Sequence, residues 1–183
     1  VFTGKISLYY TFNGCSKLVN IKNLDKLQNI TDLYYTFYNC GKITNVKFAD
    51  TENKNTTSLE ETFCYCSSLE SVDLSSFKNI TSSLYETFYK CTSLKNVKFA
   101  DAENINSIRL DETFCGCTAL QSLTNFEKFT NLYDFEYAFK SCSSLKELKL
   151  GTDPNTDNAK KTYWSSDTPF SNAFTDCNAI KYF

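Results

Sequence analysis

Histidine and methionine are both absent from the 183 residues, and Arg109 is the only arginine among the 19 basic residues. Without histidine, the chain lacks the commonest general base and the commonest metal ligand of proteins. The formal net charge of −2 does not supply the basic surface that nucleic-acid binding needs. No apolar run approaches the length of a membrane-spanning helix. We therefore expect no nucleic-acid partner, no cofactor and no membrane span in this segment.

Aromatic residues, in contrast, make up 16% of the chain, and hydrophobic residues make up 42%. A chain of this length and composition can bury the core of one domain and is not disordered by composition. We expect a single domain over residues 1–183.

A repeated pattern runs through the whole chain. A phenylalanine is followed three residues later by a cysteine, and successive phenylalanines are 25, 26, 25, 26, 25 and then 35 residues apart. We call these phenylalanines the anchors. The anchors are Phe12, Phe37, Phe63, Phe88, Phe114, Phe139 and Phe174. Threonine or alanine precedes every anchor, and apolar residues recur four before, six after and nine after it. The sequence thus contains about seven repeats of 25–26 residues, with a loop insertion at 151–168.

The repeat predicts a solenoid, because one copy cannot fold alone. About six apolar side chains of roughly 1.5–3 kcal/mol each cannot offset roughly 1–2 kcal/mol of backbone entropy for each of about 25 residues. Stacked copies bury one another and bring equivalent residues into register. Within a copy, Leu69, Val72 and Leu74 have the alternation of a strand, and residues 58–66 suit a short helix or 3₁₀ turn. We predict a β-rich α/β solenoid, with a parallel concave sheet and short helical or 3₁₀ turns on the opposite face.

Residues 61–97, ETFCYCSSLESVDLSSFKNITSSLYETFYKCTSLKNV, resemble the BspA-like leucine-rich repeats of bacterial surface proteins. Those repeats read A-F-x-x-C-x-S-L-x-x-[VI]-x-[IL], and the resemblance covers nearly the whole chain outside about 151–168. It implies a leucine-rich-repeat solenoid, a location at the cell surface or outside the cell, and a role in adhesion to a protein or glycan ligand. It implies no catalytic residues. A structural stalk that displays other domains of a longer surface protein is the alternative, and either form is a monomer or associates end to end.

Seven cysteines occupy equivalent positions three residues after the anchors, and we interpret them as a ladder of reduced, buried thiols, because equivalent side chains point the same way. Cys64 and Cys115 are additional, each two residues before a ladder cysteine. A C-x-C pair with no histidine and no second close pair does not complete a tetrahedral zinc site. We expect no metal, and leave a redox or metal role for this pair as the alternative.

Two surfaces are candidates for ligand binding. The first consists of strand positions predicted to face outward: Asn20, Lys22, Asn45, Lys47, Ser71, Asp73, Asn96, Lys98, Ser122, Thr124, Glu147 and Lys149. The second is an aromatic patch: Tyr9, Tyr10, Tyr34 and Tyr35, with Trp164 of the insertion as a further contact. Solenoids bind through extended surfaces of the first kind, and tyrosine is favoured in interfaces. Acid pairs such as Glu60 and Glu61 are the only candidates for catalysis, and we expect no enzyme.

Overall fold

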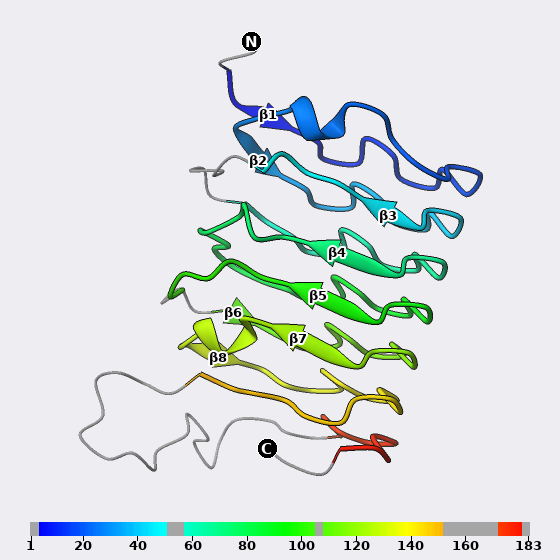
Figure 1. The fold of residues 1–183 in the computed structure, drawn as a ribbon, viewed down its shortest axis with the longest axis vertical. Helices are drawn as coiled ribbons and strands as arrows, with labels where there is room; N and C mark the ends of the chain where they lie inside the picture. The colour runs from blue at the N-terminus through cyan, green and yellow to red at the C-terminus, as the bar shows by residue number, and fades with distance from the viewer. Residues whose placement is uncertain (1–3, 51–56, 105–107, 152–171, 181–183) are drawn as a thin grey trace.

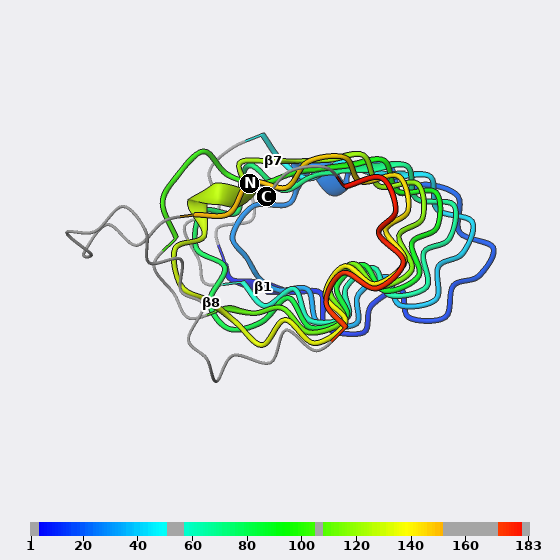
Figure 2. The same cartoon turned by 90° about the horizontal axis from the view of Figure 1, so that it is seen from below.

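The chain winds into stacked coils, one for each repeat, in a computed structural model that describes residues 4–50, 57–104, 108–151 and 172–180 (Figure 1). The predicted contact Trp164 and nearly all of the insertion lie outside these residues. Seen along the solenoid axis, the coils superpose around a common oval (Figure 2). The anchors, the ladder cysteines from Cys40 onward and most leucines of the repeats fill its interior.

A parallel sheet runs along one side of the solenoid. Its strands, in spatial order, are β3 (Asn45–Val46), β4 (Ser71–Asp73), β5 (Asn96–Lys98) and β7 (Ser122–Thr124). The register follows the repeat, since Val46, Val72, Val97 and Leu123 are paired in succession. The near-constant spacing therefore brings equivalent residues side by side, and the predicted parallel-strand solenoid is confirmed.

The opposite side carries a second, interrupted set of parallel strands (Figure 2). Here β1 (Ile6–Ser7) pairs with β2 (Ile30–Asp32), and β6 (Ile108–Arg109) pairs with β8 (Leu132–Tyr133). Single bridges such as Asp32 to Ser58 and Ser83 to Arg109 connect the coils between them. The described helices are two 3₁₀ turns, η1 (Leu24–Lys26) and η2 (Phe126–Lys128), each of which begins after an asparagine with left-handed backbone. The predicted 3₁₀ turns thus exist, but they lie after the anchor segments.

The anchor segments themselves form the rounded edge that joins the two sides (Figure 2). Residues 58–66 are a series of single hydrogen-bonded i→i+3 turns that do not join into a helix, so the predicted short helix is not formed there. Two positions in each repeat have a positive φ, and a positive φ stops a helix from continuing. The residues two before the anchors have positive φ: Tyr10, Tyr35, Glu61, Glu86, Glu112, Tyr137 and Asn172. The residues two after the anchors do too: Gly14, Asn39, Tyr65, Lys90, Gly116, Ser141 and Asp176.

The backbone N–H groups of the anchor segments bond between coils. The N–H of Phe63 donates to the carbonyl of Thr87 at 2.9 Å, and the N–H of Tyr65 donates to that of Tyr89 at 2.8 Å. The same pattern recurs in the neighbouring repeats. Bonds to the next coil therefore alternate with bonds inside the turn, such as that from the N–H of Thr62 to the carbonyl of Leu59 at 3.1 Å.

Three side-chain ladders run through the core along this edge. Neighbouring anchor rings are nearly parallel, with centroids 5.3–5.5 Å apart and interplanar angles of 2–14°. From Cys40 onward, each ladder thiol donates to the carbonyl of the anchor in the preceding coil, as Cys40 does to Phe12, at 2.8–3.2 Å. The buried threonine hydroxyls donate in the same way to leucine carbonyls of the preceding coil at 2.8–2.9 Å. These bonds satisfy the polar groups that the stacked turns bury.

Candidate functional site: a tyrosine ladder edged by carboxylates

The outward positions of the sheet form the first candidate surface. Most of them are exposed and alternate with buried neighbours, as in β4, where Val72 is buried between Ser71 and Asp73. Seven of the twelve lie on the sheet strands: Asn45, Ser71, Asp73, Asn96, Lys98, Ser122 and Thr124. The other five are exposed but lie outside the named strands: Asn20, Lys22, Lys47, Glu147 and Lys149.

Polar side chains of this sheet face bond to one another across the coils. Lys98 Nζ lies 3.1 Å from Asp73 Oδ2, and Asn96 Nδ2 donates to Ser122 Oγ at 2.9 Å. Although partial burial opposes the change, hydrogen bonds from Ser75 and the Lys98 ammonium lower the pKa of Asp73. Exposed pairs of this kind contribute about 0–1 kcal/mol each. The charges are thus partly compensated within the sheet, and its role in binding stays a prediction.

The predicted aromatic patch is brought together at the start of the anchor segments. Tyr9 stacks on Tyr34 with centroids 5.5 Å apart, and Tyr10 stacks on Tyr35 at 4.7 Å, each at an interplanar angle of 10°. The two stacks touch through Tyr34 and Tyr35 at 4.5 Å. Tyr9 and Tyr10 keep 54% and 43% of their surface exposed. Successive coils place the same tyrosines above one another, so the four rings form one surface.

This surface continues further than the sequence indicated. Tyr35 contacts Tyr38 at 5.0 Å, Tyr38 contacts Tyr65 at 5.8 Å, and Tyr65 contacts Tyr89 at 5.3 Å. The three additional residues follow the anchors by one or two positions, whereas the predicted patch consists of tyrosines that precede the anchors. We call the seven rings the tyrosine ladder: Tyr9, Tyr10, Tyr34, Tyr35, Tyr38, Tyr65 and Tyr89.

A lysine covers the far end of the tyrosine ladder. The Lys90 ammonium lies 5.4 Å from the ring centroid of Tyr65 and 5.1 Å from that of Tyr89. Both distances are within the range of a cation–π interaction. The face of the ladder therefore accepts a cation in this chain itself.

Carboxylates run beside the rings. Glu60 and Glu61 follow Tyr34 and Tyr35 at the equivalent positions of the next coil. Burial raises the pKa of Glu61 and Glu86 raises it further, while a hydrogen bond with Tyr35 opposes the shift. Burial and the same hydrogen bond raise the pKa of Tyr35, so this hydroxyl stays protonated and donates. The ladder is thus bordered by acceptors and negative charge.

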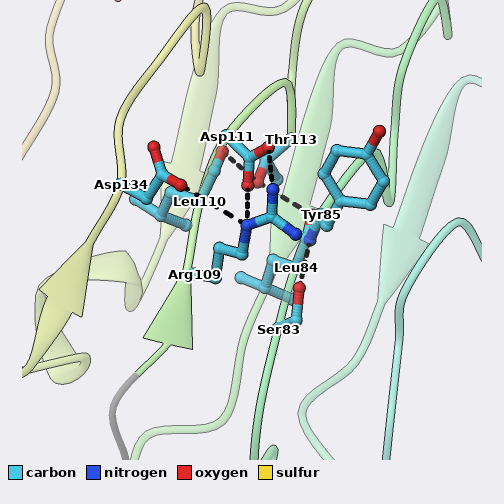
Figure 3. Close-up of polar contacts among 8 residues, drawn as sticks. All are labelled: Ser83, Leu84, Tyr85, Arg109, Leu110, Asp111, Thr113 and Asp134. Atoms are coloured by element: carbon cyan, nitrogen blue, oxygen red, sulfur yellow. Dashed lines mark hydrogen bonds and ion pairs between the residues drawn. The ribbon is translucent and has the colours of Figure 1, made fainter. Parts of the chain in front are cut away.

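The single arginine lies on β6, just before an anchor segment (Figure 3). Arg109 Nε lies 2.6 Å from Asp111 Oδ1 and 3.4 Å from Asp134 Oδ2, and the guanidinium carbon lies 4.6 Å from the ring centroid of Tyr85. Burial raises the pKa of Asp111 to about 6, even though Arg109 acts in the opposite direction. Arg109 thus connects its own coil with those of Tyr85 and Asp134, and the carboxylates of Asp111 and Asp134 compensate its charge.

The cysteines divide into two groups. Burial raises the pKa of Cys40 to about 11 and raises that of the other buried ladder thiols, which keeps them protonated and unreactive. Cys15, at the first described coil, is exposed. The two additional cysteines differ from each other, because Cys64 is fully buried and Cys115 is only partly so.

The parallel strands, the near-constant repeat and the buried leucines of each coil define a leucine-rich-repeat solenoid. The sequence model described as "BspA type Leucine rich repeat region" matches six copies over residues 5–110 and 78–183. The chain belongs to this family, whose members are usually surface proteins and serve as scaffolds for protein interaction. A search of curated proteins and a search of solved structures find no match. Within the described residues, no helix has the length and apolar character to cross a membrane.

Proposed function

We propose that this chain is a non-enzymatic adhesion module of a surface or secreted protein, and that it binds a protein ligand through the tyrosine ladder. The observation that carries the proposal is the run of seven touching tyrosine rings, two of them close to half exposed. Tyrosine covers contact area at little cost in side-chain entropy and is enriched in interfaces. Rings that served only the core would be buried, whereas Tyr9 and Tyr10 are in contact with solvent.

The charge beside the ladder favours a ligand segment with basic side chains. A guanidinium or ammonium group can lie on a tyrosine face and pair with a neighbouring carboxylate at the same time. The Lys90 ammonium already lies over tyrosine rings at the end of the ladder, and Glu60 and Glu61 supply carboxylates for pairing. A glycan ligand, and a structural stalk that binds nothing, are the competing interpretations.

The test is a binding measurement with a labelled arginine-rich peptide, its acidic counterpart and a glycan array. The double variant Tyr9→Ser, Tyr34→Ser removes the most exposed stack while leaving the core intact. We expect it to weaken binding of the basic peptide at least about tenfold, as expected when interface hot spots are lost. The matched control is Lys47→Ala, Asn96→Ala, Lys98→Ala on the sheet face, which should change the affinity less than about twofold.

Three results would overturn the proposal. If the sheet-face variant loses binding and the tyrosine variant does not, the sheet is the binding surface. Selective binding in the glycan array alone would make the ligand a glycan. If the wild-type chain binds none of the probes, the stalk is the better interpretation.

A further inference from the structure

Three side chains that could ligate a metal converge beneath the tyrosine ladder. Glu61 and Cys64 lie on one coil, and Glu86 lies at the position of Glu61 on the next coil. Their ligand atoms, two carboxylate oxygens and one thiol sulfur, all lie within 4.8 Å of one another. Cys64 Sγ is 3.4 Å from Glu86 Oε2. The turn brings the first two residues to the same side, and stacking of the coils adds the third.

The same place has a buried carboxylate, Glu61, without a matching cation. Glu61 is 8% exposed and Cys64 is 0% exposed. Among the described residues, neither Glu61 nor Glu86 forms an ion pair. A buried carboxylate is costly unless a positive charge compensates it, and a second carboxylate beside it adds to the cost. This imbalance is independent of the ligand geometry, and it too indicates a bound cation.

We propose that Glu61, Cys64 and Glu86 bind one divalent transition-metal ion, for which Zn²⁺ is the best match. Zinc accepts thiolate and carboxylate ligands in tetrahedral geometry. With Zn–S near 2.3 Å and Zn–O near 2.1 Å, neighbouring sulfur and oxygen ligands of a tetrahedron lie about 3.6 Å apart. The observed separation of 3.4 Å between Cys64 Sγ and Glu86 Oε2 is close to this value. The ion replaces the thiol proton, which passes to solvent, and water fills the fourth position.

Hard cations match this ligand set less well. Calcium requires six to eight oxygen ligands, and magnesium requires an octahedron of oxygens. A thiolate among three protein ligands selects for a softer ion. Two tyrosine hydroxyls orient the carboxylates, since Tyr35 is hydrogen-bonded to Glu61 and Tyr85 to Glu86. Hydrogen bonds of this kind fix ligand orientation in metal sites.

The second C-x-C segment supplies an internal comparison. Glu112 and Cys115 repeat Glu61 and Cys64 51 positions later, but Tyr137 stands at the position that corresponds to Glu86. Lys90 and Lys140 lower the pKa of Glu112 against the effect of burial and so supply positive charge there. The second copy thus lacks one ligand and has lysine charge beside its glutamate. It should not bind the ion.

The experiment is a titration of the reduced chain with Co²⁺, which reports thiolate ligation through a charge-transfer absorption band. We expect one equivalent of Co²⁺ to bind with this band and Zn²⁺ to displace it. Cys64→Ala should abolish the band, whereas the matched control Cys115→Ala should retain it at full amplitude. The double variant Glu61→Gln, Glu86→Gln keeps the size of both side chains and should weaken Co²⁺ binding at least about tenfold.

Circular dichroism of each metal-free variant shows whether it is folded. If Cys64→Ala does not fold, the glutamine variant decides whether the cluster binds Co²⁺. The proposal is overturned if the wild type shows no band, if the band survives in Cys64→Ala, or if it disappears in Cys115→Ala. Unchanged affinity in the glutamine variant would equally overturn it. These outcomes do not depend on whether the tyrosine ladder binds a protein.

Discussion

Replacing Phe63 by alanine tests the stacked core directly. The Phe63 ring is fully buried between those of Phe37, with centroids 5.4 Å apart, and Phe88, at 5.5 Å. A buried Phe→Ala change typically costs about 3–5 kcal/mol, and each stacked aromatic pair contributes about 0.5–1.5 kcal/mol beyond the area it buries. With two such pairs, we expect a loss near the upper end, about 4–5 kcal/mol of the free energy of unfolding. This is a large share of the roughly 5–15 kcal/mol that holds a domain together.

Phe12→Ala is the matched control at the first described coil. Phe12 is only partly buried, and Phe37 is its one anchor neighbour among the described residues. We expect a loss of about 2 kcal/mol, roughly half that of Phe63→Ala. Urea unfolding followed by far-ultraviolet circular dichroism measures both values. Equal losses in the two variants, or a loss below about 2 kcal/mol for Phe63→Ala, would refute the stacked-coil account of stability.

Other changes test the hydrogen-bond ladder, the left-handed turns and the buried acid. Thr87→Val should cost about 1 kcal/mol in urea unfolding, because the Thr87 hydroxyl donates to the carbonyl of Leu59 at 2.9 Å. Gly116→Ala should cost about 1–2 kcal/mol, since φ is +77° and an added Cβ would lie 3.2 Å from a neighbouring coil, whereas Gly4→Ala, with open space, should be nearly neutral. The raised pKa of Asp111, about 6, means that its stabilising contribution is present at acid pH and is lost as pH rises through 6. Asp111→Asn should therefore gain up to about 3 kcal/mol relative to wild type between about pH 4 and pH 7, and a pH-independent difference would contradict this.

The repeat alone was enough to predict the parallel sheet and the stacked anchors. Equal spacing leaves each strand one register with its neighbour, so Val72 had to lie beside Val97. The path of the anchor segments could not be predicted in the same way. Glycine at Gly14 and Gly116 indicates a left-handed backbone, but asparagine, tyrosine, lysine, serine and aspartate occupy the equivalent positions of the other repeats. Here, bonds between coils decide the conformation, and local propensity does not.

The candidate site was predictable only in part for a related reason. Tyr9 and Tyr34 share a position in the repeat, so their stack followed from the alignment. The continuation through Tyr38 depends on how the turn places residues before and after the anchor on the same side, which required the turn conformation. The metal cluster likewise needs Glu86 from the next coil. A search for close ligand pairs along the sequence does not find a site that is completed by stacking.

The sheet and the edge of the solenoid differ in how charges are arranged, and this contrast favours the edge as the place of function. On the sheet, stacking places Lys98 beside Asp73, so opposite charges face each other. On the edge, it places Glu61, Glu86 and Glu112 in one column, where coils about 4.8 Å apart bring like charges together. Such a column destabilises the fold, and burial together with Glu86 raises the pKa of both Glu61 and Glu112. Since a sequence departs from stability chiefly at functional sites, the acidic edge beside the tyrosine ladder, and not the sheet, is where a cationic ligand would relieve the strain.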